Sequence, residues 1–139
     1  MKVMVLGKAT AQSEAGEFGA AEDFAAMDRY MRQLTEAGIL LAGDGLQPSS
    51  KAKRVAVEAD GTTRVIDGPF TEAKELVAGY SIWEVSSMDE AVEWAKRSPL
   101  RGVVELRKIL DADDFSDAFA AEIAAAEEHV RAEAATNAT

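Results

Sequence analysis

The chain has 139 residues and a net charge of −10, and it contains no cysteine and a single histidine, His129. This length supports one compact domain with a hydrophobic core rather than two full domains. Without cysteine the chain has no disulfide, no thiolate metal site, no iron–sulfur cluster and no cysteine nucleophile. One imidazole excludes a two-histidine metal site within one chain, and any Ser-His-Asp triad would have to use His129.

The negative charge is concentrated near the C-terminus. Residues 1–110 carry 17 acidic and 14 basic side chains, a net charge of −3, whereas residues 111–139 carry 8 and 1, a net charge of −7. An acidic chain without a lysine- or arginine-rich stripe repels phosphate backbones and anionic lipids, so we expect no direct binding to nucleic acids or membranes. The N-terminal apolar run is too short for a signal peptide, and no stretch approaches about 18 apolar residues. These features predict a soluble, cytoplasmic protein.

The N-terminal part of the chain predicts two strands separated by a loop and a helix. An apolar run ended by glycine predicts a buried strand at residues 2–7, and small polar residues with two glycines predict a loop at 8–21. The next apolar residues recur at intervals of three and four, which predicts an amphipathic helix that ends at Gly38. Residues 39–42 predict a second strand, and the glycines and proline of residues 43–48 predict a bend.

A hairpin and a further strand follow. Residues 54–59 and 62–66 flank Asp60-Gly61, a two-residue hairpin signal, so we expect the two segments to pair as antiparallel strands. Residues 77–85 predict a fifth strand.

A capping box predicts where the second helix begins. The hydroxyl of Ser87 is expected to accept from the Glu90 amide, while the Glu90 carboxylate reaches back to the Ser87 amide. This helix starts at Met88 and ends at or before Ser98, because the proline that follows restricts its predecessor. Residues 103–110 predict the sixth strand.

The acidic C-terminal segment also has a helical pattern, from which we expect a third amphipathic helix with frayed ends at residues 134–139. Its apolar positions are Phe115, Phe119, Ile123, Ala126 and Val130. The chain is therefore expected to comprise an α+β domain at residues 1–110 and an acidic helical tail at residues 111–139.

This order of elements predicts a ferredoxin-like α+β fold with an inserted β-hairpin and a C-terminal helix. Several strands are apolar on both faces: Tyr80 and Ile82 lie opposite Trp83 and Val85 in the fifth strand. Because two helices can cover only one face of the sheet, we expect a homodimer in which two copies pack sheet against sheet. The alternative is that the C-terminal helix covers the second face within one chain.

The sequence DGPFTEAKE, which begins at Asp67, is the densest polar cluster. Asp-Gly-Pro is a turn signal in which the aspartate caps its own turn, the glycine permits unusual backbone angles and the proline fixes the next one. Phe70 is expected to plug the core and anchor the loop. Behind it, Lys74 lies between Glu72 and Glu75, and such a group can bind an anion or perform acid–base chemistry in a partly dry cleft. The alternative is an exposed turn whose ion pairs contribute little.

The DGPFTEAKE string resembles the signature of the YCII-related family, in particular of its DGPF branch. Upstream, GDGLQP at residues 43–48 is similar to a Gly-acidic-Gly-Leu-x-Pro segment, and downstream Gly79-Tyr80 is similar to a small–aromatic pair. The helix that begins with MDEA at residues 88–91 also resembles its counterpart in the family. The resemblance covers residues 1–110 and implies a ferredoxin-like, dimeric α+β barrel.

What the resemblance implies about function is limited. Some family members carry a His-Asp pair in a cleft and are regarded as candidate enzymes, and some relatives are fused to or neighbour extracytoplasmic-function sigma factors. The histidine of that pair has no counterpart here, because His129 lies in the tail, so the pair is not carried over. A further departure is Ser98-Pro99, where relatives often have Cys-Pro.

With the resemblance, we expect a ligand cleft between the loop and the dimer seam. Asp67 would orient the loop, Lys74 would supply positive charge, and Tyr80 or Trp83 would form an aromatic wall. As alternatives, Asp67 acts only as a turn cap and Trp83 only as a core residue. The candidate cleft residues are Asp44, Asp67, Glu72, Lys74, Glu75 and Tyr80, and the structural motif of the loop is Gly68, Pro69 and Phe70.

The main hypothesis is therefore a small-molecule-binding protein or enzyme with no assigned catalytic residues, no cofactor and no metal. The alternative is a protein-interaction or accessory module linked to sigma-factor transcription, which uses the tail at residues 111–139 as its docking surface. A third hypothesis is that every motif residue only determines the fold.

Overall fold

The computed structural model describes residues 1–71 and 75–138. Its backbone contacts divide the chain into two units, of which unit 1 spans Met1–Lys108 and unit 2 spans Ile109–Thr139.

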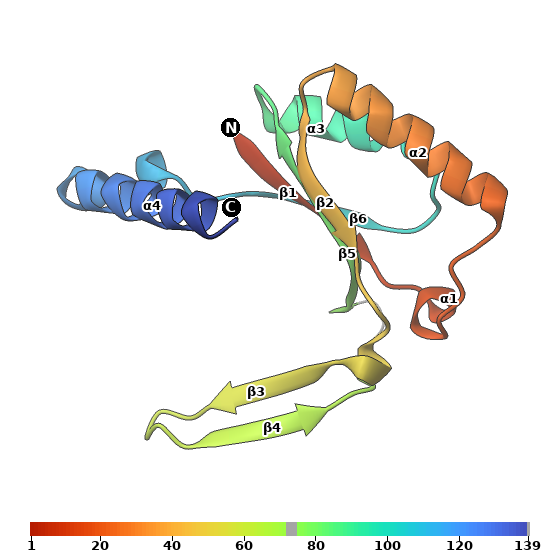
Figure 1. The fold of residues 1–139 in the computed structure, drawn as a ribbon, viewed down its shortest axis with the longest axis horizontal. Coiled ribbons are helices and arrows are strands. Elements are labelled where there is room, and N and C mark those ends of the chain that lie inside the picture. Colours follow the sequence, from red (N-terminus) through yellow and green to blue (C-terminus); the bar gives the residue numbers. More distant parts are fainter. Residues whose placement is uncertain (72–74, 139) are drawn as a thin grey trace. The chain divides into compact units, whose positions relative to one another are not determined.

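Unit 1 is built on a four-stranded antiparallel sheet with the strand order β2-β5-β1-β6 (Figure 1). With its two main helices, the order along the chain is β1-α2-β2-β5-α3-β6, which is the ferredoxin-like arrangement expected from the sequence. The α+β class is thus confirmed. The four strands are β1 (Lys2–Lys8), β2 (Leu40–Gly45), β5 (Val77–Glu84) and β6 (Val104–Lys108).

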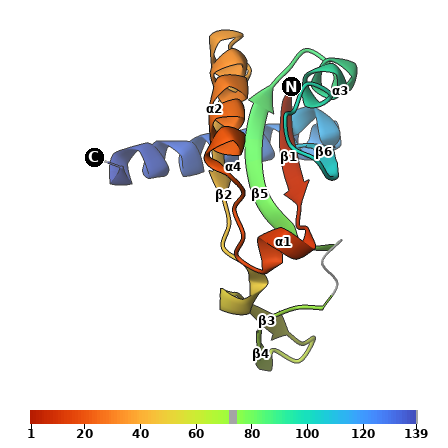
Figure 2. The same ribbon diagram turned by 90° about the vertical axis from the view of Figure 1, so that its right-hand side faces the viewer.

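Helices α2 (Ala21–Glu36) and α3 (Met88–Ala95) cover one face of this sheet (Figure 2). The core between the layers contains Val3 and Trp83 from the sheet, with Trp83 only 2% exposed, which confirms Trp83 as a core residue. The hydroxyl of Tyr30 in α2 donates to the carbonyl of Trp94 in α3 at 2.7 Å, so a polar contact also joins the helices.

The ends of the two helices follow the sequence signals in part. Gly38 has a φ of +74° directly after α2, as expected for a glycine at a helix end. The Ser87 hydroxyl accepts from the Glu90 amide at 3.1 Å, but the Glu90 carboxylate accepts from the backbone and hydroxyl of Ser86 rather than from the Ser87 amide. The predicted capping box is therefore only half right.

The predicted loop at residues 8–21 was partly wrong, because it contains a short helix, α1 (Ala11–Glu14). The hydroxyl of Thr10 accepts from the Ser13 amide at 3.1 Å, and the Ser13 hydroxyl accepts from the Thr10 amide at 2.9 Å. These reciprocal bonds satisfy amides at the helix start and explain why polar residues form a helical turn here.

Strand β2 is longer than predicted, because Gly43 and Gly45 continue the ladder where a bend was expected. They pair with Ser81 and Gly79 of β5, and a Cβ on Gly43 would lie 3.1 Å from the Cβ of Ser81. Glycine thus allows a close approach of two strands at this point. A 3₁₀ turn, η1 (Ser49–Lys51), follows.

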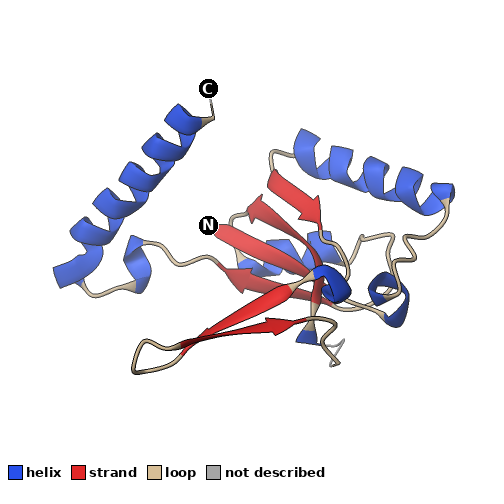
Figure 3. Cartoon of the chain, turned by 60° about the horizontal axis from the view of Figure 1, so that its bottom comes forward, coloured by secondary structure: helices blue, strands red, loops and turns tan. Residues whose placement is uncertain are grey.

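The inserted hairpin forms a separate two-stranded sheet of β3 (Lys53–Val57) and β4 (Thr63–Asp67), as Figure 3 shows. The pairing was predicted, but the two-residue turn was not correct. The Glu58 amide donates to the Thr62 carbonyl at 2.7 Å, which closes a three-residue loop with Gly61 at a φ of +88°. A left-handed glycine is typical of such three-residue loops.

The face of the four-stranded sheet opposite α2 and α3 is called here the open face. It carries Met4 and Leu6 of β1 and Tyr80 and Ile82 of β5, all of them half-buried and brought side by side by the β1–β5 register. Both faces of the strands are therefore apolar, as the sequence indicated.

Unit 2 consists of η3 (Ala112–Asp114) and helix α4 (Asp117–Asn137). The helix was expected, but the predicted fraying from residue 134 was wrong, because alanine-rich sequence with high helix propensity continues α4 to Asn137. His129 is exposed, and its Nε2 lies 3.1 Å from Glu133 Oε1 one turn later. Among the helices of the described residues, none is both long and apolar enough to cross a membrane.

Candidate functional site

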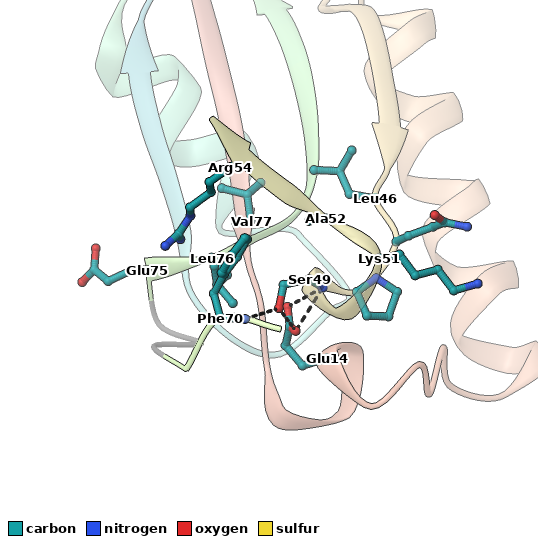
Figure 4. A pocket seen from close by; sticks show the side chains of 12 residues that line it. Glu14, Leu46, Ser49, Lys51, Ala52, Arg54, Phe70, Glu75, Leu76 and Val77 are labelled. Carbon is teal, nitrogen blue, oxygen red and sulfur yellow. Dashed lines mark hydrogen bonds between the residues drawn. The ribbon is translucent and has the colours of Figure 1, made fainter. Parts of the chain in front are cut away.

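A cavity of about 430 Å³ lies in unit 1 where strands β2 and β5 meet η1 and the hairpin (Figure 4). Its apolar wall includes Leu46, Phe70, Leu76 and Val77. Among the described residues, its charged and polar lining consists of Glu14, Gln47, Ser49, Lys51, Arg54 and Glu75. The cavity therefore lies beside the DGPF sequence, where a cleft was expected.

Ser49 ties together the floor of the cavity. It is only 6% exposed, and its hydroxyl donates to Glu14 Oε2 at 2.6 Å while accepting from the Phe70 amide at 3.0 Å. The Ser49 amide also donates to Glu14 Oε2, at 3.1 Å. One buried hydroxyl thus links α1, η1 and the loop after β4.

Gly68 is required by close packing against the same residue. A Cβ on Gly68 would lie 1.7 Å from the Ser49 carbonyl oxygen, and the Gly68 amide donates to the Ala52 carbonyl at 2.9 Å. Its φ is not in the left-handed region, and the Gly68–Pro69 peptide bond is cis. The glycine of the motif therefore permits contact between two backbones, not the unusual backbone angle that was predicted.

Phe70 lines the cavity instead of plugging the core, so that prediction was wrong. The ring is half-buried, and the guanidinium carbon of Arg54 lies 3.7 Å from its centroid. The bond from the Phe70 amide to Ser49 holds the residue at the cavity. The cation–π contact covers ring surface that would otherwise face water.

The remaining residues of the motif are dispersed. Asp67 ends β4, and among the described residues its carboxylate bonds across the hairpin to Lys53 Nζ at 2.5 Å rather than capping the next turn. It is exposed and does not line the cavity, whereas Glu75 does. Glu72 and Lys74 lie outside the described residues.

Asp44 and Tyr80 are brought together as neighbours in the β2–β5 register. The Tyr80 hydroxyl donates to Asp44 Oδ2 at 3.0 Å, and this bond, with the carboxylate charge, raises the pKa of Tyr80. The pairing continues to Leu46, whose amide donates to the Ala78 carbonyl at 2.8 Å. By strand alternation, Leu46 follows Asp44 on the open face. Asp44 and Tyr80 therefore lie on the same face of the sheet as Leu46, which lines the cavity.

Sequence reasoning missed Glu14, Ser49 and Arg54. Glu14 and Ser49 are 35 positions apart, so no local pattern relates them. Arg54 could have been found from its place in the hairpin, because Arg54 pairs with Ile66, directly before the motif. Within residues 1–71 and 75–138, no three histidine or carboxylate side chains lie close enough together to hold a metal ion.

The family model of the YCII-related domain matches residues 1–113. The chain belongs to the YCII-related family, as the DGPFTEAKE resemblance indicated.

The proteins to which this chain is similar include an uncharacterised relative and an enzyme of solved structure. An uncharacterised protein of Rhizobium meliloti (strain 1021) is 35% identical over 87 residues, which cover 60% of this chain and 69% of the relative. A solved structure of 5-chloro-2-hydroxyhydroquinone dehydrochlorinase (TftG) from Burkholderia phenoliruptrix AC1100, in complex with 2,5-dihydroxybenzoquinone, is 15% identical with a TM-score of 0.44. That match covers 84% of this chain and 100% of the other.

Proposed function

We propose that the protein binds a small organic molecule in the cavity between Leu46 and Phe70. The observation that carries this proposal is the cavity itself, whose volume of about 430 Å³ is within the range of small-molecule sites. Its wall combines apolar side chains with a few polar groups, the composition that such sites usually have.

The polar groups of the floor support a preformed site. Ser49 is buried and has hydrogen bonds to both Glu14 and Phe70, so the elements that surround the cavity are held together before any ligand arrives. A preformed site loses less conformational entropy on binding than a flexible one.

We propose that the protein binds a ligand, and we assign no reaction to it. The Ser49 hydroxyl already donates to Glu14 and accepts from Phe70, which is the arrangement of a structural bridge rather than of a free nucleophile. The one histidine of the chain lies in α4 of unit 2. An enzymatic role would therefore need groups other than the family's His-Asp pair.

A thermal-shift screen with a metabolite library tests the proposal on three forms of the full chain. Leu46→Trp places a larger side chain in the wall of the cavity, and Leu41→Trp makes the same change at another exposed leucine that is not part of the lining. We expect compounds that stabilise the wild type and Leu41→Trp but not Leu46→Trp. Hits that stabilise all three forms equally would place the ligand elsewhere and reject the proposal.

We also propose that two copies pair through the open face, as in a dimeric α+β barrel. The side chains of Met4, Leu6 and Ile82 on this face are apolar and half-buried within unit 1. A second copy would remove them from water. The cavity wall at Leu46 would then lie near the seam between the two copies.

The remaining expectations stay predictions. The DGPF branch, a cytoplasmic location and a sigma-factor-related partner are consistent with the sequence, and no contact among the described residues bears on them. The tail at residues 111–139 remains the surface on which such a partner would dock.

A further inference from the structure

We infer that the ligand of this cavity is a small organic carboxylate with an apolar body, held by the guanidinium of Arg54 beside the ring of Phe70. The inference rests on the proposed function, because it names the chemical class of the molecule that the cavity would bind.

Arg54 has side-chain donors that no other described residue uses. Its guanidinium lies 3.7 Å from the centroid of Phe70, and it has no hydrogen bond or ion pair with any other described residue. By contrast, Arg64 of the neighbouring strand pairs with Glu58 at 3.4 Å. Contact with the ring uses the face of the guanidinium, so the N–H donors in its plane remain available. A planar fork of donors matches a carboxylate in a bidentate geometry.

Neither of the two carboxylates among the described lining residues forms an ion pair with Arg54. Glu14 accepts bonds from the amide and the hydroxyl of Ser49, which occupy it on the floor of the cavity. The Glu75 carboxylate forms no ion pair with another described residue. Lys51 is a second cation in the lining, so the described lining residues carry two positive charges beside the two carboxylates.

The rest of the lining favours a carboxylate over a phosphate. Phosphate sites commonly use several free backbone N–H groups. Here the Ser49 amide donates to Glu14 and the Phe70 amide donates to the Ser49 hydroxyl, so neither is available. Leu46, Leu76 and Val77 supply an apolar wall that an organic body would contact. The guanidinium of Arg54 beside this apolar wall therefore favours a ligand with one carboxylate and an apolar body.

The test is an NMR titration of the ¹⁵N-labelled full chain with three matched probes: cinnamate, its neutral amide cinnamamide, and styrylphosphonate. We expect all observed shifts to centre on the amides of Leu46, Phe70 and Val77. Cinnamate should bind about tenfold or more tightly than cinnamamide, which is the scale of a charge-assisted hydrogen bond. Arg54→Met, which keeps the apolar stem, should abolish this preference, and Arg64→Met should retain it.

The outcomes separate the two proposals. Equal affinity for cinnamate and cinnamamide, or a preference that survives in Arg54→Met, would overturn the carboxylate inference and leave the cavity as a ligand site. Tighter binding of styrylphosphonate than of cinnamate would also overturn it, in favour of a phosphate group. In a further outcome, the library screen has hits that Leu46→Trp abolishes while no probe shifts the cavity amides. That result would reject the carboxylate inference and leave the proposed function standing. If that screen also has no such hits, the proposed function fails.

Discussion

The hydroxyl of Tyr80 in β5 donates to the carboxylate of Asp44 in β2, with 3.0 Å between the two oxygens. The bond joins two strands on the open face, and it requires the phenol to be protonated. The hydrogen bond and the negative charge of Asp44 both raise the pKa of Tyr80. The pKa rises because the nearby negative charge of Asp44 disfavours the negatively charged phenolate form of Tyr80.

Replacing Asp44 by asparagine should lower the pKa of Tyr80 towards its ordinary value, because the negative charge is removed. The measurement is a pH titration of the tyrosine ring carbons by NMR, which follows Tyr80 and Tyr30 separately. Asp28→Asn, which changes an exposed carboxylate of α2 paired with Arg32, is the control and should leave the pKa of Tyr80 unchanged. An unaltered pKa in Asp44→Asn would show that the two side chains are not bonded in solution.

The pH dependence of stability should reflect Tyr30. Burial raises its pKa to about 12, from an ordinary value of 10.0. A raised pKa in the folded state means that the folded chain holds a proton that the unfolded chain has lost, so the free energy of unfolding should fall as pH rises from 10.0 to about 12. Urea unfolding across this interval measures the slope. Tyr30→Phe should make the slope shallower, and an identical slope in the variant would contradict the assignment.

Gly68→Ala should destabilise the protein by more than about 2 kcal/mol, the range of severe steric substitutions. The reason is that the new Cβ would lie 1.7 Å from the Ser49 carbonyl oxygen, so two backbone segments would have to separate. Gly45→Ala is the matched control, because a Cβ there has no neighbour within 4 Å. Chemical unfolding of both variants checks the prediction. Equal stability of the two would mean that the Gly68–Ser49 contact is absent.

Ser49→Ala should lower the free energy of unfolding by about 1–3 kcal/mol, because it leaves the part-buried Phe70 amide without its acceptor and removes the hydroxyl bond to Glu14. Ser50→Ala changes the adjacent, exposed serine and should cost far less. The same unfolding assay compares the two. A loss no greater in Ser49→Ala than in Ser50→Ala would rule out the bridging role of the Ser49 hydroxyl.

The dimer proposal predicts that a charge on the open face weakens association. In Leu6→Glu, each copy would bring a carboxylate into the dimer interface, because a two-fold dimer uses the same surface of both copies. Sedimentation should change from dimer to monomer while circular dichroism shows the folded spectrum. Val57→Glu, on the exposed hairpin, should remain dimeric. A wild-type chain that is monomeric at high concentration would refute the proposal.

Much of the fold could be predicted, because its signals are local. The apolar spacing that ends at Gly38 and the serine cap at Ser87 depend on neighbouring residues, and both correspond to helix ends in the structure. The extension of β2 through Gly43 could not be predicted from that strand alone, because it depends on how closely Ser81 of β5 approaches.

The candidate site was predictable only in outline. The motif beginning at Asp67 lies beside the cavity, and the structure brings Asp44 and Tyr80 together, although neither of them lines it. The position of Phe70 depends on Ser49, which is 21 positions away, and Ser49 in turn depends on Glu14. Such contacts between distant segments are set by the tertiary fold and leave no periodic pattern in the sequence.

The most direct test of the ligand site is a crystal structure of the wild-type protein soaked with a library of small organic fragments. We expect fragments to bind in the cavity between Leu46 and Phe70, with carboxylate groups directed to Arg54. Fragments bound at other sites, with this cavity empty in every data set, would contradict it.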